Sequence, residues 1–294
     1  MLSNLSGIFP PLTTPFTEDE LALDKLLRNV RKYERRELTG YVLFGSNGES
    51  AFLTRDEKLK LISEIREHTK KVLIAGTGSD SIKETINLSN EAAERGANYA
   101  LIISPSFFKS EMKHHTFLNY YTRVAESVMI PIIIYNVPKF TNVSIEPETI
   151  IELSQHPNIA GLKDSTEIVP RISEIVENVP NSFKVIVGTA SILYPGLTAG
   201  ASGGILALAN LVPDECLKIY IHYIEGKHKD ALKLQNRMIP VNRAITTKFG
   251  IAGLKTAMDI LGYDGGNPRM PLEPLNEAQI IELKIILKTA SLLE

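Results

Sequence analysis

Two residues that follow apolar runs are of types that could act on a carbonyl compound. Lys163 ends the apolar run in HPNIAGLKDST, and Tyr135 lies near the end of PIIIYN. A lysine amine can add to a carbonyl carbon and form an imine, and a phenol can transfer the proton that this chemistry moves. Most lysines at strand ends only reach into solvent, so the residue types alone leave both interpretations open.

Imine formation requires a neutral amine. An ordinary lysine has a pKa of about 10.4, so only about one in 10³ to 10⁴ is neutral at pH 7. Burial away from carboxylates favours the neutral form, so a catalytic Lys163 should be buried without an acidic partner. Asp164 is the adjacent acid, and neighbouring strand residues point to opposite faces. We therefore expect Asp164 to face away from Lys163.

Eight short apolar runs rich in β-branched residues would position these side chains. The stretches between them are long enough for helices, and one begins with the capping-box pattern of Thr54 and Glu57. Continuously apolar strands joined by helices are typical of parallel sheets. The runs lie near residues 7, 41, 72, 100, 131, 159, 184 and 203. This pattern predicts a (β/α)8 TIM barrel, an α/β fold whose reacting groups lie at the carboxyl ends of the strands.

A C-terminal helical extension is expected beyond the barrel. AGLKTAMDILG and NEAQIIELKIILKTASLLE have helical periodicity, and the intervening GYDGGNPRMPLEPL is rich in glycine and proline, which indicates a loop. We assign residues 1–225 to the barrel and residues 226–294 to the extension that packs on it.

The segment GSNGES, residues 45–50, has two interpretations. Asn-Gly between apolar runs is a strong hairpin signal. The helix expected next favours instead a loop whose N–H groups, with the Ser46 hydroxyl and the Asn47 amide, hold a carboxylate. GTGSDS at residue 76 lacks the third glycine of a dinucleotide-binding fingerprint, so a nucleotide cofactor is not expected.

Composition narrows the class of partners. The 294 residues include 32 Lys plus Arg and 34 Asp plus Glu without a basic stripe, so nucleic acid is not an expected partner. The single cysteine, Cys216, suits a reducing compartment and a packing role, and the histidines lack a metal-ligand spacing. No targeting segment or membrane-spanning run is recognisable. We expect a cytoplasmic protein without a cofactor, metal or membrane contact.

Four segments in order, GSNGES, YNVP, GLKDS and FGIAGLKTAMDILGYDGGNPRMPL, resemble the dihydrodipicolinate synthase / N-acetylneuraminate lyase superfamily over essentially the whole chain. The resemblance implies a class I aldolase that forms a Schiff base with pyruvate, uses an aldehyde partner and assembles as a homotetramer, a dimer of dimers. It makes Lys163 the Schiff-base lysine and Tyr135 the proton-transferring phenol. The substrate contacts that it implies are Ser46 and Asn47 at the pyruvate carboxylate, with Ser165, Gly188 and Ile205.

Departures from the synthase pattern bear on the substrate. Dihydrodipicolinate synthases carry Thr-Thr in place of Ser46-Asn47, and an arginine for the aldehyde's carboxylate in place of Phe140. The segments GSNGE, LSQHPNIAGLKDS, FGIAGLK and GYDGG are most similar to 4-hydroxy-2-oxoglutarate aldolases and 2-keto-3-deoxy sugar acid aldolases. We therefore expect cleavage of a 4-hydroxy-2-oxo acid to pyruvate and an aldehyde. The alternatives are condensation of pyruvate with aspartate semialdehyde and dehydration of a keto-deoxy sugar acid.

A second departure lies in SPSFFKSEM. Many superfamily members have a tyrosine pair there, one of which is lent to the neighbouring subunit as a proton relay, whereas Phe107 and Phe108 cannot carry a proton. We expect Phe108 and Phe140 to contribute to substrate specificity. The missing relay also leaves open a protein that binds 2-oxo acids without turnover.

Overall fold

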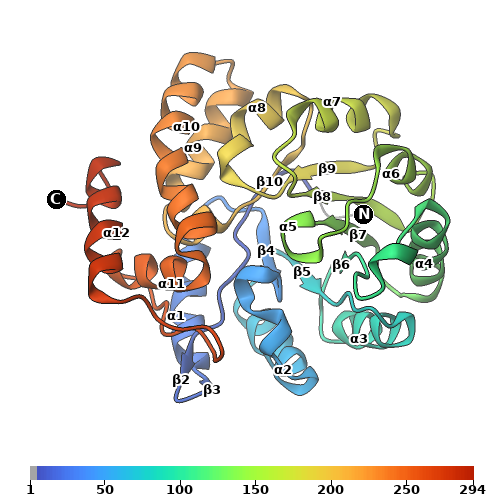
Figure 1. The fold of residues 1–294 in the computed structure, drawn as a ribbon, viewed down its shortest axis with the longest axis horizontal. Helices are drawn as coiled ribbons and strands as arrows, with labels where there is room; N and C mark the ends of the chain where they lie inside the picture. The colour runs from blue at the N-terminus through green and yellow to red at the C-terminus, as the bar shows by residue number, and fades with distance from the viewer. Residues whose placement is uncertain (1–4) are drawn as a thin grey trace.

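The computed structural model describes residues 5–294, in which parallel strands form a barrel surrounded by helices (Figure 1). Each barrel strand coincides with one of the eight predicted runs, so the predicted TIM barrel is confirmed. The strands are β1 (Gly7–Phe9), β4 (Gly40–Leu43), β5 (Val72–Gly76), β6 (Tyr99–Ile103), β7 (Ile132–Asn136), β8 (Ile159–Asp164), β9 (Lys184–Val187) and β10 (Gly203–Ile205).

The barrel closes between its first two parallel strands. The eight barrel strands are hydrogen-bonded in the order β1-β10-β9-β8-β7-β6-β5-β4, so β1 and β4 lie at the two ends of this order. Backbone bonds join these ends: the N–H of Leu12 donates to Val42 O at 2.9 Å, and the N–H of Val42 donates to Pro10 O at 3.1 Å. Closure removes the free sheet edges and brings the carboxyl ends of all strands to one rim.

The strands are apolar without alternation because both faces are buried. Ile133 and Tyr135 belong to the cluster inside the barrel, whereas Ile132 and Ile134 belong to the larger cluster between strands and helices. The same alternation places Leu162 in the outer cluster and directs Lys163 to the inside. A buried lysine at the end of β8 is therefore a consequence of strand parity.

Helices form the outer layer of the barrel. Thr54 begins α2 with the predicted capping box, because its hydroxyl accepts from the N–H of Glu57 at 3.2 Å and its own N–H donates to the Glu57 carboxylate at 2.8 Å. These helices are α1 (Leu23–Glu34), α2 (Arg55–His68), α3 (Ile82–Glu94), α4 (His114–Ser127), α5 (Pro138–Thr141), α6 (Pro147–Leu153), α7 (Val169–Asn178), α8 (Leu193–Thr198) and α9 (Pro213–Ile224).

Short turns and one hairpin complete the rim. A two-residue antiparallel pair, β2 (Phe16–Thr17) with β3 (Glu20–Leu21), precedes α1. The 3₁₀ turns are η1 (Ser46–Gly48), η2 (Ser50–Phe52), η3 (Lys109–Glu111), η4 (Ala190–Ile192) and η5 (Ala207–Asn210).

The C-terminal helices lie against one side of the barrel (Figure 1). They are α10 (His228–Arg243), α11 (Gly250–Ile260) and α12 (Glu277–Thr289), with a π-helical turn, η6 (Ala244–Lys248), between the first two. The two helices and the intervening loop predicted for this region are confirmed. The domain boundary between residues 225 and 226 stays a prediction. Across residues 5–294, no helix combines the length and apolar character that crossing a bilayer requires.

Candidate active site

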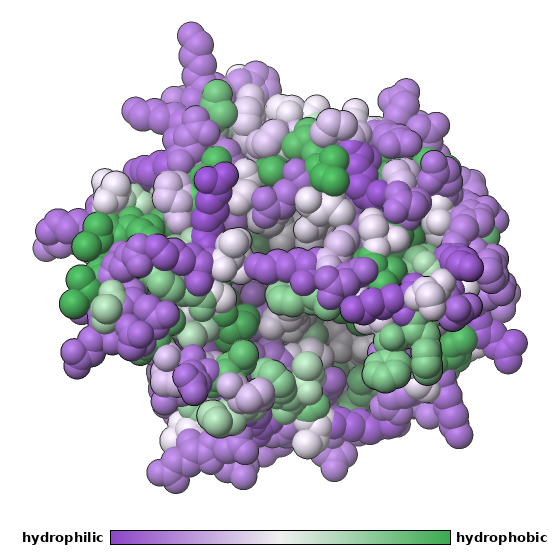
Figure 2. Space-filling model, viewed as in Figure 1, coloured by the Kyte–Doolittle hydropathy of each residue, from purple (hydrophilic) through white to green (hydrophobic). Residues whose placement is uncertain are grey.

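A cavity of about 470 Å³ at the carboxyl ends of the strands brings together most of the predicted site residues. Figure 2 shows this face of the molecule hollowed near its centre, with apolar side chains around the hollow. The predicted residues that line the cavity are Ser46, Asn47, Tyr135, Phe140, Lys163, Ser165 and Gly188. They come from five different segments, so only the closed barrel makes them neighbours.

Lys163 and Tyr135 are paired by the register of the sheet. They are direct partners across β7 and β8, and the Lys163 Nζ lies 4.0 Å from the centroid of the Tyr135 ring. Only 3% of Lys163 and 5% of Tyr135 is exposed. Within residues 5–294, no carboxylate forms an ion pair with Lys163. This is the environment that we expected for a lysine that attacks a carbonyl.

Asp164 points to the opposite side of β8, as the alternation of strand residues predicted. Its carboxylate accepts from Arg171 Nε at 3.1 Å, from Asn136 Nδ2 at 3.0 Å and from the N–H of Thr166 at 2.9 Å. Both Asp164 and Arg171 are buried, so the acid has a cation of its own outside the barrel. The negative charge next in sequence to Lys163 is thereby balanced away from the cavity.

The GSNGES segment forms a turn of η1 type, and the hairpin interpretation is wrong. Gly48 N–H donates to Gly45 O at 3.0 Å, and the Thr14 hydroxyl donates to Gly48 O at 2.8 Å. In the described chain, the backbone N–H groups of Ser46 and Asn47 have no hydrogen-bond partner. The Ser46 hydroxyl lies 3.3 Å from the Tyr135 hydroxyl. We call Ser46–Gly48 the cradle, because Ser46 and Asn47 line the same cavity as Lys163 and are the residues expected to hold a carboxylate.

Ser165 and Gly188 form a matched pair at the ends of β8 and β9. A Cβ atom on residue 188 would lie 1.9 Å from the Ser165 Oγ and 2.9 Å from the Ser165 Cβ. Gly188 N–H also donates to Asp164 O at 2.7 Å, which fixes the distance between the two segments. The missing side chain of Gly188 therefore makes room for Ser165 in the cavity wall.

Two predicted site residues lie elsewhere in the single chain. Ile205 is fully buried among the side chains inside the barrel and is not part of the cavity wall. Phe108 lies on the surface with 69% of its area exposed, and its ring meets that of Phe107 edge to face at a centroid distance of 5.0 Å. The structure therefore does not bring Phe108 to Lys163 within one chain.

Sequence reasoning missed one wall of the cavity. The π-helical turn η6 contributes Ile245, Thr246 and Thr247 to this wall. The Lys139 Nζ donates a hydrogen bond to Thr246 O at 2.5 Å, and Lys139 also lines the cavity. Single π-turns inside helices are frequent at functional sites. The turn was missed because helical periodicity in a sequence does not reveal a local change to π geometry. The signal that could have pointed to this segment was the adjoining motif FGIAGLK.

The described residues include neither a cluster of metal-ligating side chains nor an exposed thiol. Residues 5–294 contain no cluster of three or more His, Cys, Asp or Glu side chains that could hold a metal ion. Cys216 is fully buried in α9, and this burial raises the pKa of its thiol well above the ordinary range. A protonated, enclosed thiol is a packing group and not a nucleophile.

Comparison with known proteins identifies the family. The model for the Dihydrodipicolinate synthetase family matches residues 4–290. The 4-hydroxy-tetrahydrodipicolinate synthase of Methanococcoides burtonii is 35% identical over 273 residues, which cover 92% of this chain and 93% of that protein. The protein of the same name from Methanothrix thermoacetophila is 32% identical over 287 residues and 97% of each chain.

Solved structures agree over the same length. The dihydrodipicolinate synthase of Aquifex aeolicus has a TM-score of 0.92 at 30% identity, covering 98% of this chain and 99% of that one. YagE of E. coli K12, a prophage protein of the dihydrodipicolinic acid synthase family solved in complex with pyruvate, has a TM-score of 0.91 at 26% identity, with the same coverage. The barrel and its helical extension match these solved structures. The chain therefore belongs to the dihydrodipicolinate synthetase family of class I, pyruvate-dependent aldolases.

Proposed function

We propose that this protein makes or breaks a carbon–carbon bond between pyruvate and an aldehyde through an imine on Lys163. The observation that carries the proposal is the placement of Lys163, which is buried without an acidic partner, 4.0 Å from the Tyr135 ring and in one cavity with the cradle. A buried amine, a phenol and free N–H donors are the groups that this reaction needs.

The steps follow from these positions. The Lys163 amine adds to the C2 carbonyl of pyruvate, and loss of water gives an iminium ion. Removal of a proton from C3 gives an enamine, whose carbon attacks the aldehyde carbon while the Tyr135 hydroxyl protonates the aldehyde oxygen. Water then hydrolyses the imine and releases the product and the free amine. The cradle holds the pyruvate carboxylate throughout, and the reverse sequence is the cleavage of a 4-hydroxy-2-oxo acid.

Condensation is the direction that the relatives support. The curated relatives described above are named 4-hydroxy-tetrahydrodipicolinate synthase, at 35% and 32% identity over nearly the whole chain. These names favour the alternative that we considered, condensation of pyruvate with aspartate semialdehyde, over the cleavage of 4-hydroxy-2-oxoglutarate that the motifs led us to expect. We take condensation as the first candidate reaction.

Cleavage remains the second candidate because of one residue at the cavity mouth. Phe140 lines the cavity with 58% of its area exposed, and an aromatic ring cannot bind a carboxylate as the arginine expected of the synthases would. Lys139 is the cation beside it, and its ammonium is already bonded to Thr246 O. An aldehyde without a carboxylate at this position would fit the ring better, which favours a 2-keto-3-deoxy sugar acid over 4-hydroxy-2-oxoglutarate as the compound cleaved.

Borohydride reduction tests the shared chemistry. The protein is incubated with pyruvate and borohydride, and intact mass and peptide mapping then locate the adduct. We expect one pyruvate adduct, on the peptide that contains Lys163, and none in a Lys163→Ala variant. A folded wild-type protein without an adduct would refute the proposal.

Product analysis separates the two candidates and the non-catalytic alternative. Condensation consumes aspartate semialdehyde together with pyruvate, whereas cleavage of a 2-keto-3-deoxy sugar acid or of 4-hydroxy-2-oxoglutarate releases pyruvate. A protein that only binds 2-oxo acids would be stabilised against heat by pyruvate without forming either product.

A homotetramer is part of the proposal. The adjacent rings of Phe107 and Phe108 are 77% and 69% exposed, and large exposed apolar side chains of this kind favour contact with another copy. Light scattering coupled to gel filtration measures the assembly, and a monomer would contradict this part of the proposal. One solved neighbour, 26% identical with a TM-score of 0.93, is described as a monomeric dihydrodipicolinate synthase variant, so a monomer also occurs in this fold.

A further inference from the structure

A buried ion pair lies directly behind the cradle. Glu49 follows η1, Lys255 projects from α11, and the Lys255 Nζ pairs with the Glu49 Oε1. Both side chains are completely enclosed. The loss of hydration of two buried charges often exceeds their mutual attraction, so such a pair is weak evidence for added stability. Its position behind the cradle suggests a role in holding that turn.

Several contacts hold the Lys255 ammonium. Its Nζ donates to Asn267 O at 2.9 Å and lies 4.6 Å from the centroid of the Phe16 ring. Burial lowers the pKa of Lys255, and the adjacent Glu49 carboxylate opposes this shift. The charge of the ammonium therefore depends on its partner, and the two residues act as one unit.

The backbone of Glu49 explains why its side chain must be held. Its φ of 55° and ψ of 39° lie in the left-handed region, which non-glycine residues rarely adopt. Its N–H donates to Ser46 O at 3.2 Å, and its carbonyl accepts from Phe52 at 2.8 Å, so this residue joins η1 to η2. The Arg269 N–H donates to the second carboxylate oxygen at 2.8 Å. The ion pair at one carboxylate oxygen and the hydrogen bond at the other thus fix the residue at the end of the cradle.

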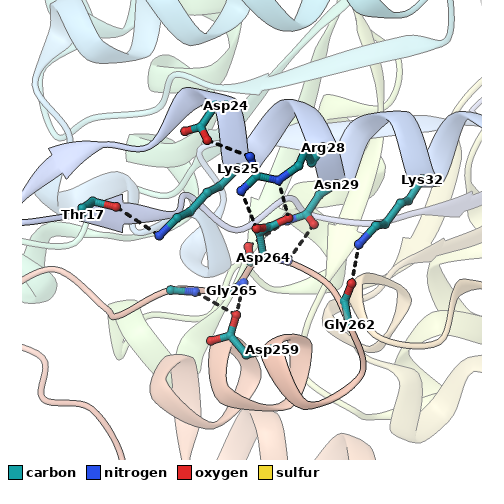
Figure 3. Close-up of polar contacts among 11 residues, drawn as sticks. Thr17, Asp24, Lys25, Arg28, Asn29, Lys32, Asp259, Gly262, Asp264 and Gly265 are labelled. Atoms are coloured by element: carbon teal, nitrogen blue, oxygen red, sulfur yellow. Dashed lines mark hydrogen bonds and ion pairs between the residues drawn. The ribbon is translucent and has the colours of Figure 1, made fainter.

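The segment that supplies these partners is itself clamped to the barrel (Figure 3). Arg28 of α1 donates to both Asp264 carboxylate oxygens, at 2.7 and 3.2 Å. The Asn29 side chain donates to Asp264 O at 2.8 Å and accepts from the Asp264 N–H at 2.9 Å, and Lys32 donates to Gly262 O. These bonds hold the GYDGG loop against α1. The end of α11 and the loop that follows it therefore have a fixed position relative to the cradle.

We propose that Lys255, acting through Glu49, is a positioning residue for the cradle, so that the C-terminal extension sets the affinity for the pyruvate carboxylate. This inference rests on the proposed function and adds a control from outside the barrel. Neither Lys255 nor Glu49 is among the residues that line the cavity around Lys163, although Glu49 lines an adjoining cavity together with Ser46 and Tyr135. In the proposal, both residues act through the cradle. A shift of the turn would move the Ser46 and Asn47 donors away from the carboxylate without moving Lys163.

Three variants test the proposal. The double variant Lys255→Met with Glu49→Gln removes both charges and nearly preserves the side-chain volumes. Glu49→Asp alone keeps both charges and withdraws the carboxylate from Lys255 by one methylene group, so it is the milder change and serves if the double variant does not fold. Leu88→Ala changes a buried residue of α3 that does not line the cavity around Lys163, and it is the matched control for lost stability.

The first readout is the pyruvate concentration that gives half-maximal borohydride trapping, measured well below the unfolding midpoint of each variant. We expect it to rise about tenfold in the double variant, because misplaced contacts remove binding energy, while trapping at saturating pyruvate changes less than about threefold. Leu88→Ala should leave both values unchanged. An unchanged half-maximal concentration in the double variant, with a lowered unfolding midpoint, would show a purely structural pair and overturn the inference.

The second readout does not depend on turnover. Hydrogen–deuterium exchange of residues 45–52 should be faster in the double variant than in wild type and in Leu88→Ala, while exchange in β6 stays the same. If wild type forms no pyruvate adduct, the proposed function fails, and this exchange measurement still decides the positioning role. Equal exchange of residues 45–52 in all the proteins would overturn it.

Discussion

Replacing Gly188 with alanine tests whether Ser165 must occupy its present place. The new Cβ would lie 1.9 Å from the Ser165 Oγ, 2.9 Å from the Ser165 Cβ and 3.0 Å from Asp164 O. The two segments cannot move apart freely, because the Gly188 N–H donates to Asp164 O at 2.7 Å. Either the serine side chain leaves the cavity wall or this bond lengthens.

The magnitude follows from these two responses. Adding a methyl group to a packed interior typically costs about 1–3 kcal/mol of unfolding free energy. Loss of one hydrogen bond from Ser165 to the substrate costs about 0.5–1.5 kcal/mol, which is about a two- to tenfold fall in kcat/KM. We therefore expect Gly188→Ala to lower both the unfolding midpoint and kcat/KM, with KM carrying most of the kinetic change.

A companion variant makes the explanation refutable. Ser165→Gly removes both serine atoms that the new methyl group would strike, so Gly188→Ala should cost much less stability in that background. Thermal unfolding and kcat/KM of the two single variants and the double variant complete a double-mutant cycle. Additive losses in the double variant, or a Gly188→Ala protein as stable and active as wild type, would refute the reasoning.

Three further predictions concern the tyrosine, the outer ion pair and the loop arginine. Tyr135→Phe should lower kcat about 10²-fold or more in a coupled assay, while the borohydride adduct still forms. Arg171→Met strands the buried Asp164 carboxylate, so urea unfolding should show a loss of about 3–5 kcal/mol. The Arg269 guanidinium lowers the pKa of Glu57 in the folded protein below its ordinary value of 4.5. The ionised carboxylate therefore stabilises the fold fully above pH 4.5, and this stabilisation is lost as the pH falls through the pKa of the folded protein. Below pH 4.5, the unfolding midpoint of Glu57→Gln should therefore fall less steeply than that of wild type.

Each of these has a contradicting result. Full activity of Tyr135→Phe would remove the phenol from proton transfer. Wild-type stability of Arg171→Met would show that the Asp164 carboxylate does not need its cation. Parallel acid profiles of wild type and Glu57→Gln would mean that the Arg269 contact does not bias the protonation of Glu57.

The sequence was sufficient to predict the barrel and to single out Lys163 and Tyr135 as the proposed reactive pair. Eight continuously apolar runs predict buried parallel strands, because a strand covered on both faces has no polar side to alternate with. Strand parity then separates Lys163 from Asp164, and the structure confirms that the acid faces outward to Arg171. The capping box at Thr54 is equally local, since both partners lie within one helical turn.

Contacts between distant segments were decided only by the tertiary structure. The register of β7 against β8 pairs Tyr135 with Lys163, and no local pattern specifies that alignment. Packing of the C-terminal helix α11 against the barrel brings Lys255 into contact with Glu49, although the two residues lie far apart in sequence. Periodicity records which face of an element is buried, whereas the partner across that face depends on packing the whole chain. The residues proposed to react could therefore be identified from the sequence, whereas the contacts that hold them in place could not.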